Sequence, residues 1–312
     1  MKICMVGLGS IGKRHLGNLI TALERRGRAY QIDALRSSRT PLGEKWESRI
    51  CRQYDAAECL PGDYDAVFVT NPTSLHYDTI QELAPKTKHM FIEKPVFDSP
   101  GYNPDDLPLK EDGIYYVACP LRHKGILKYI KERIVEEEKI ISVRVVSTSY
   151  LPSWREGMDY RTVYSADKDM GGGVTRDLIH EWDYIQYLFG IPEKVCHIQE
   201  HVSELEINSD DVSVYLARYP GMILEMHLDY IGQKTERMLQ LFTNDKRMDA
   251  DLVSDVIYEY QGDRLVRKME FPKEDHYLNE IEYFLDCMEG RRKNFNTVGD
   301  AYRTLETAMT EE

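Results

Sequence analysis

The feature that most constrains the fold is a glycine-rich turn, GLGSIG at residues 7–12, directly after an apolar run at residues 2–6. The run has the composition of a buried strand, and residues 13–26 have helical spacing of apolar residues. In a strand–turn–helix unit the glycines allow a tight turn, close approach of a diphosphate, and close packing of helix on strand. The helix N-terminus adds unpaired N–H groups and partial positive charge. We therefore predict a dinucleotide site that includes Gly7, Gly9, Ser10, Ile11 and Gly12.

Strand-like and helical patterns alternate through the first third of the chain. This alternation predicts a doubly wound parallel sheet covered by helices on both faces, an α/β fold of the Rossmann type. Three prolines and two glycines predict a loop at residues 98–113. We place the Rossmann domain at residues 1–120, with predicted strands at 2–6, 32–35, 66–70, 89–92 and 115–118.

After residue 121 the pattern changes to a helix at 121–138 followed by a succession of strand-like runs. Their order predicts a second α/β domain, at residues 121–312, with an antiparallel, meander-like sheet. A helix after Gly173 would cover one face and leave the other for a partner subunit in a dimer or tetramer. The last helix could pack back on the first domain. The predicted strands are 140–150, 194–201, 212–219, 222–230, 238–243 and 256–260, and the predicted closing helices are 272–289 and 298–310.

Composition excludes several classes of protein. No run of about 18 apolar residues could cross a bilayer, and the N-terminus lacks the features of a signal peptide, so we expect a cytoplasmic protein. A net charge of −13 without a basic stripe excludes nucleic acid as a partner. The six cysteines have no metal-ligand spacing, so no metal is expected.

The residues after the second predicted strand distinguish NADP from NAD. An NAD site usually has an acidic residue there to hold the ribose hydroxyl, whereas this chain has Arg36, Ser37, Ser38 and Arg39. Guanidinium and hydroxyl groups suit a 2′-phosphate, which favours NADP(H). The alternative is that Asp33 holds the ribose of NAD and the arginines are solvated surface.

Several further motifs occur in a characteristic order, and together they resemble the glucose–fructose oxidoreductase/inositol dehydrogenase/MocA family. They are the glycine turn, the sequence from Asn71 and Pro72 to His76, the tripeptide Glu93-Lys94-Pro95, and the segment from Gly171-Gly172-Gly173 to Asp177, His180 and Asp183. The resemblance implies an N-terminal Rossmann domain and a substrate-binding C-terminal α/β domain with an open, mostly antiparallel sheet used in oligomerisation. The implied substrate is a sugar, a sugar derivative or a cyclitol. It also implies that Lys94 and His180 lie beside the nicotinamide, with Asn71, Pro72, His76 and Glu93 at the cofactor. The stretch 151–165 looks like a subgroup associated with surface polysaccharides and nonulosonic-acid-type sugars.

Hydride transfer at a secondary alcohol or ketone also needs a proton transfer at the oxygen. His180 could act as general acid or base, and Lys94 could stabilise charge that develops on the oxygen. Asp177 and Asp183 lie three residues on either side of His180 on a predicted helix, so one of them could orient its imidazole, and we favour Asp177. Arg176 occupies a position where many family members have aspartate, which puts the proton relay in doubt. Apart from the resemblance, a histidine satisfied within the core is the alternative for His180.

A basic and aromatic cluster offers candidates for substrate binding. Such side chains can stack on a sugar and clamp a carboxylate or phosphate, or they can form a protein interface. Arg122, beside His123, could reach the substrate or lie on the surface at a helix N-terminus. The candidates are Arg122, Trp154, Arg155, Tyr160, Arg161, Tyr164 and Arg176.

These observations favour an NADP-dependent oxidoreductase that acts on a sugar or sugar derivative. A dinucleotide-binding sensor of the same fold without turnover is the alternative, and it would be marked by loss of Lys94 or His180. An interaction protein built on the antiparallel sheet leaves the glycine turn unexplained.

Overall fold

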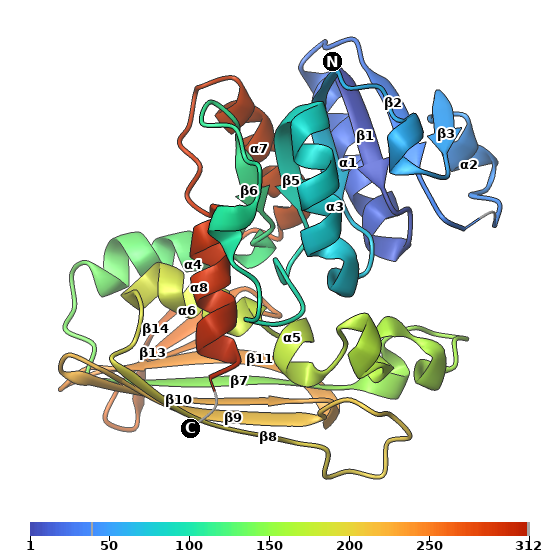
Figure 1. Ribbon diagram of the computed structural model, residues 1–312. Coiled ribbons are helices and arrows are strands. Elements are labelled where there is room, and N and C mark those ends of the chain that lie inside the picture. Colours follow the sequence, from blue (N-terminus) through green and yellow to red (C-terminus); the bar gives the residue numbers. More distant parts are fainter. Residues whose placement is uncertain (39, 311–312) are drawn as a thin grey trace. The chain divides into compact units, whose positions relative to one another are not determined.

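A computed structural model describes residues 1–38 and 40–310, which divide into two compact units (Figure 1). Unit 1 combines Met1–Pro120 with Asp275–Leu305, and unit 2 combines Leu121–Glu274 with the residues from Glu306 onward. The segment Asp275–Leu305 therefore belongs to unit 1, although it follows most of unit 2 in the sequence. None of the described helices combines the length and apolar character that crossing a bilayer requires.

Unit 1 contains a parallel sheet with strand order β3-β2-β1-β4-β5-β6 among the described residues. The doubly wound fold is confirmed, and the five predicted strands are present within two residues at each end. The short edge strand β3 was missed. The strands are β1 (Lys2–Val6), β2 (Gln31–Leu35), β3 (Arg52–Tyr54), β4 (Tyr64–Val69), β5 (Thr87–Ile92) and β6 (Tyr115–Val117).

Helices cover both faces of this sheet because successive strand residues point to opposite sides. Helices α1 and α7 share one face and α3 lies on the other (Figure 1). The ring of Phe284 in α7 packs edge-on against Phe68 of β4 and Phe91 of β5, with centroids 5.6 and 5.5 Å apart. The helices are α1 (Ser10–Arg25), α2 (Glu44–Glu47), α3 (His76–Leu83), α7 (His276–Met288) and α8 (Val298–Ala308), whose last residues belong to unit 2.

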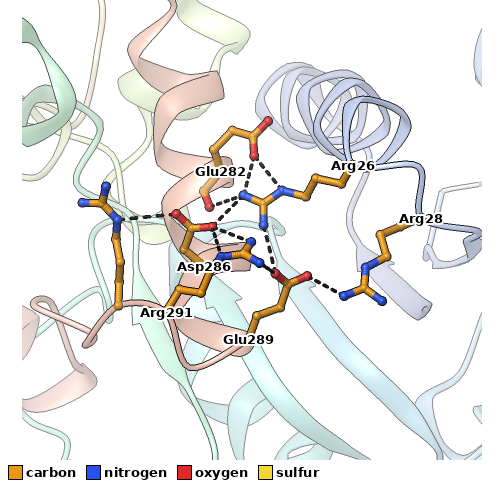
Figure 2. Close-up of polar contacts among 7 residues, drawn as sticks. Arg26, Arg28, Glu282, Asp286, Glu289 and Arg291 are labelled. Carbon is orange, nitrogen blue, oxygen red and sulfur yellow. Dashed lines mark hydrogen bonds and ion pairs between the residues drawn. The ribbon is translucent and has the colours of Figure 1, made fainter.

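An ionic cluster joins the C-terminal ends of α1 and α7 (Figure 2). The Arg26 guanidinium contacts Glu282, lies 3.0 Å from Asp286, and lies 3.4 Å from Glu289. Arg28 and Arg291 complete the cluster by pairing with Glu289 and Asp286, at 3.1 and 2.7 Å. The cluster adds directional contacts to the apolar packing between the two helices.

Unit 2 contains an eight-stranded sheet among the described residues, with order β14-β13-β12-β11-β7-β10-β9-β8. All neighbouring pairs are antiparallel except β7 and β10, so the prediction of a mostly antiparallel sheet is confirmed. Strands β12 and β14 were missed. The strands are β7 (Ser142–Tyr150), β8 (Lys194–Glu200), β9 (Val212–Tyr219), β10 (Met222–Asp229), β11 (Ile231–Phe242), β12 (Arg247–Asp251), β13 (Val256–Gln261) and β14 (Arg264–Glu270).

The helices of unit 2 lie on one face of this sheet (Figure 1). They are α4 (Gly125–Tyr129), which continues as a π-helical turn over Ile130–Val135, α5 (Val174–Asp177) and α6 (His180–Phe189). The strand register places Ile198, Leu216 and Ile223 on the opposite face, and all three are more than half exposed. That face of the sheet is therefore partly apolar.

Candidate functional site

The glycine turn has the geometry of a cradle for an anion. Gly7 has a φ of +80°, and a Cβ atom there would lie 2.8 Å from Cα of Asn71. A Cβ on Gly12 would lie 2.4 Å from the carbonyl oxygen of Gly7, whereas a Cβ on Gly9 would meet no atom within 4 Å. Two glycines thus allow close packing of the turn, and the third leaves open space above it.

The N-terminus of α1 opens directly from this turn. Gly9 is the N-cap, and among the described residues no side chain caps the helix there. The first turn, which includes Ser10 and Ile11, contains no acidic residue. The partial positive charge of the helix end is therefore available to an anion.

The end of β2 carries hydroxyl and guanidinium groups. Arg36 donates hydrogen bonds to Gln53 Oε1 at 3.0 Å and to the Thr40 carbonyl at 2.5 Å. Ser37 and Ser38 are exposed beside it, and the Ser38 hydroxyl donates to the Thr40 hydroxyl. Arg39 lies outside the described residues.

The alternative assignment of Asp33 to the cofactor ribose is not supported by its position. Asp33 lies within β2, is 1% exposed, and accepts a hydrogen bond of 2.9 Å from the Tyr64 hydroxyl. Burial, together with this hydrogen bond, raises the pKa of Tyr64, so the phenol keeps its proton and remains the donor. The Asp33 carboxylate is therefore held by a hydrogen bond within unit 1.

The tripeptide Glu93-Lys94-Pro95 follows β5 at the carboxyl edge of the sheet, where open α/β sheets bind ligands. Glu93 is buried, and its Oε2 accepts the backbone N–H of Lys94 at 3.1 Å. Its Oε1 contacts Nε2 of His15 on α1. Burial alone would raise the pKa of Glu93, but the hydrogen bond and charge of His15, with the charge of Lys94, hold it below its ordinary value.

His76 ties two loops of unit 1 together. It is buried, and its Nδ1 and Nε2 lie 2.9 Å from the Pro95 carbonyl and 3.1 Å from the Asn71 carbonyl. Burial lowers the pKa of His76, although the hydrogen bonds to these carbonyls oppose the effect. The Asn71 side chain donates to the Thr79 hydroxyl, and Pro72 begins the short turn before α3. Cofactor contacts for these residues stay predictions.

The expected continuous helix through Asp177 and His180 is wrong. Helix α5 ends at Asp177, Leu178 has non-helical dihedral angles, and α6 begins at His180. The i, i+3 argument for a shared helix face therefore does not apply to Asp177, whereas Asp183 does lie three residues after His180 on α6, where it pairs with Arg122. Asp177 instead accepts a hydrogen bond of 2.6 Å from Tyr230, whose hydroxyl is fully buried and keeps its proton because burial and the charge of Asp177 raise its pKa.

Arg122 and Asp183 form a buried ion pair inside unit 2. Nε and Nη2 of Arg122 lie 2.9 and 2.8 Å from the two carboxylate oxygens. Burial raises the pKa of Asp183, while the guanidinium opposes this shift. At least part of the hydrogen-bonding capacity of Arg122 is therefore taken within the fold, and its contact with a substrate stays a prediction.

Three of the predicted substrate-binding residues line one pocket in unit 2. Trp154, Arg155 and Tyr160 border it together with apolar side chains, including those of Leu151 and Met158. The Trp154 indole donates to the Ser149 hydroxyl and packs edge-on against Tyr230, at 5.2 Å between centroids. The pocket thus combines an aromatic surface with a guanidinium group.

The remaining candidates of the basic and aromatic cluster make contacts within unit 2. Arg161 pairs with Asp159 and Glu206 at the surface, at 2.8 and 3.0 Å. The Tyr164 hydroxyl donates to the Gly171 carbonyl, and Arg176 donates to the Gly172 carbonyl. Tyr164 and Arg176 therefore brace the glycine segment before α5.

Two residues of the site were missed from the sequence. His15 stands three positions after Gly12, and its place on the buried face of the predicted helix was a readable signal. Tyr230 is the last residue of a predicted strand, but no local pattern connects it with Asp177, which lies 53 positions away.

Comparisons with known proteins agree across both units. A family model described as an oxidoreductase family with an NAD-binding Rossmann fold matches residues 1–102, and the GFO/IDH/MocA C-terminal domain matches residues 130–246. The chain is 27% identical to myo-inositol 2-dehydrogenase of Thermotoga maritima over 312 residues, which cover 91% of this chain and 87% of that protein.

Solved structures share the fold. UDP-N-acetylglucosamine 3-dehydrogenase GnnA from Acidithiobacillus ferrooxidans has a TM-score of 0.77 and 17% identity, covering 99% of this chain and 95% of that one. The WlbA dehydrogenase from Bordetella pertussis, solved with NADH and UDP-GlcNAcA, has a TM-score of 0.77 and 17% identity, covering 98% and 94%.

Proposed function

Because the chain belongs to the GFO/IDH/MocA oxidoreductase family, we propose that it transfers a hydride between NADP(H) and a secondary alcohol or ketone of a sugar derivative. The proposal rests on the glycine turn after β1. Helix α1 begins at this turn, and no side chain among the described residues caps its N-terminus. The relatives named as sugar and inositol dehydrogenases support a sugar-like substrate.

The residues of unit 1 fit a dinucleotide. The open space at Gly9 and the end of α1 suit the diphosphate, with Gly7, Ser10, Ile11 and Gly12 forming the turn. The nicotinamide would supply or accept the hydride. Support for NADP over NAD comes from Arg36, Ser37 and Ser38 after β2 and from the internal use of Asp33. Asn71, Pro72, His76 and Glu93 border the same carboxyl edge of the sheet.

We assign the proton chemistry to groups that follow β5 and that begin α6. The Lys94 ammonium would stabilise negative charge developing on the substrate oxygen, and the His180 imidazole would take or give its proton. Asp177, held by the Tyr230 hydroxyl, is the carboxylate proposed to orient the imidazole. A stable hydrogen bond from a buried phenol fixes the direction of that carboxylate.

The side chains around Trp154 are chemically suited to a substrate that carries an anionic group, although the space they enclose, about 10 Å³, is only water-sized, so the proposal rests on the chemistry of these side chains. An indole face can stack on a sugar ring, and the Arg155 guanidinium can bind a carboxylate or phosphate with two hydrogen bonds. Tyr160 supplies a further hydroxyl at the pocket wall. Arg122, Arg161, Tyr164 and Arg176 complete the proposed substrate-binding set.

A homo-oligomer is part of this proposal. The open face of the unit 2 sheet exposes Ile198, Leu216 and Ile223 side by side, and apolar faces of this kind are covered in protein interfaces. Light scattering of the protein and of a Leu216→Asp variant tests it. A monomeric native protein contradicts this part of the proposal.

The proposed reaction is tested in two steps. Titration with NADPH and with NADH, followed by quenching of tryptophan fluorescence, measures cofactor binding. Trp46 is a suitable reporter because its ring packs over Gly17 of α1, the helix that begins at the glycine turn. A Cβ atom added to Gly17 would lie 3.4 Å from that ring. A panel of neutral and acidic sugars, with and without a nucleotide group, is then followed by absorbance of the reduced nicotinamide.

The outcomes separate the proposal from its alternative. Tight NADPH binding with turnover of one sugar class, abolished by Lys94→Ala and by His180→Ala, supports the oxidoreductase. Nucleotide binding without turnover of any sugar in the panel favours a dinucleotide sensor. Failure to bind either nucleotide refutes both.

A further inference from the structure

A buried histidine on α1 contacts the carboxylate that precedes Lys94. From this geometry we infer that His15 is a positioning residue, which acts through Glu93 to fix the backbone of Lys94 and to couple it to the helix under the glycine turn. The inference rests on the proposed role of Lys94.

The surroundings of His15 are apolar apart from this one contact. The imidazole is fully buried, and the rings of Phe91 and Tyr277 lie 4.8 and 6.1 Å from it. Its Nδ1 has no hydrogen-bond partner within residues 1–38 and 40–310. An apolar side chain would fill this position without burying an unsatisfied nitrogen. Packing alone therefore does not explain a histidine here.

The Glu93 carboxylate connects His15 with the Lys94 backbone because its two oxygens contact different parts of the chain. Oε1 contacts His15 on α1, and Oε2 accepts the Lys94 N–H. A charged acceptor forms a stronger hydrogen bond than a neutral one, so the negative charge on Glu93 fixes the peptide group more firmly. Removal of His15 would leave this buried carboxylate without its contact to α1.

The other side of Lys94 is also held. The carbonyl of Pro95 lies 2.9 Å from Nδ1 of His76, which reaches over from the start of α3. His15 thus acts on the Lys94 N–H through Glu93, and His76 contacts the carbonyl of Pro95, one residue beyond Lys94. The two buried histidines come from α1 and α3. Because His15 lies in the second turn of α1, a shift of that helix on diphosphate binding would move Glu93 and the Lys94 peptide with it.

Chemical labelling of lysine tests the inference without a substrate. The protein is treated with trinitrobenzenesulfonate, and the labelling rates of Lys94 and of the exposed Lys88 are measured by peptide mass spectrometry. The ratio of the two rates reports how accessible and reactive the Lys94 amine is relative to Lys88, whereas general loosening of the fold raises both rates. The variants are His15→Phe, Glu93→Gln, their combination, His15→Gln, and Leu19→Val as a buried control four residues along α1.

We expect His15→Phe and Glu93→Gln each to change the ratio by about fivefold, with no further change in the double variant, because residues of one network are not additive. His15→Gln should retain most of the native ratio, since its amide N–H can donate to Glu93. Leu19→Val should leave the ratio unchanged. Additive effects in the double variant, or native ratios in both single variants, would overturn the inference. The ratio is measured without nucleotide, so failure of NADPH binding would count against the proposed function alone.

Discussion

Replacement of Arg36 by alanine should remove the proposed preference for NADPH over NADH. The guanidinium has neutral hydrogen-bond partners among the described residues, Gln53 and the Thr40 carbonyl, so no carboxylate there competes with a phosphate. A hydrogen bond to a charged group contributes about 1.5–3 kcal/mol. At about 1.4 kcal/mol per factor of ten, the Kd for NADPH should rise by about 10–100-fold. NADH has no 2′-phosphate, and its Kd should change by less than about twofold, a loss under 0.5 kcal/mol.

Fluorescence titration of each variant with both nucleotides measures this change as the ratio of the two Kd values. Arg49→Ala is the matched control, because Arg49 is an exposed arginine of the same unit, paired with Glu24, and its removal alters net charge equally. The ratio should be native in this control. An unchanged ratio in Arg36→Ala, or an equal loss in Arg49→Ala, would show that Arg36 does not recognise the 2′-phosphate.

Three further substitutions test the geometry. Gly12→Ala should abolish binding of both nucleotides and lower the Tm, because its Cβ would lie 2.4 Å from a backbone oxygen of the turn; native titration curves would contradict the cradle. Arg26→Ala should lower the free energy of unfolding in urea by about 2 kcal/mol, since it leaves a charged cluster incomplete, whereas the exposed Arg25→Ala should have little effect. Arg122→Met should lower the free energy of unfolding by about 3–5 kcal/mol, because it leaves Asp183 buried and unpaired. Adding Asp183→Leu should recover most of this stability, and a failure to recover it would argue against the ion pair as the cause.

The sequence was sufficient to predict elements that bury an apolar pattern. Strands β1 and β4 of unit 1 are runs of mostly buried residues, whereas β9 and β10 of unit 2 alternate buried with more exposed residues, and all four were found within two positions of their ends. Strand β11 begins seven residues before its predicted start, because its first residues, from Ile231 to Glu236, are largely exposed. The edge strands β3 and β14 were missed because nearly all of their side chains are exposed, so hydrophobic periodicity is absent. Strand β12 was missed for another reason. It has only two apolar residues, Met248 and Ala250, and its buried middle position is Asp249, which pairs with Arg247, so no strand-like apolar run is visible.

The site was predictable where its chemistry is encoded locally. The glycine turn and the lysine after β5 each depend on a short motif in a strand–turn context. The contacts of His15 with Glu93 and of Tyr230 with Asp177 join residues 78 and 53 positions apart, which spacing cannot reveal. The break between α5 and α6 was also hidden, because Leu178 and its neighbours are ordinary helix-forming residues.

The return of the chain to unit 1 has a consequence for its synthesis. Ile281, Phe284 and Leu285 of α7 belong to the same apolar core as Phe68 and Phe91. These late residues are translated only after the intervening residues 121–274, about 150 of them, which takes about 8–30 s at the usual elongation rate. During that interval the nascent first unit exposes an unfinished core on the ribosome, where chaperones can bind it. A chain truncated before α7 would keep that core open permanently.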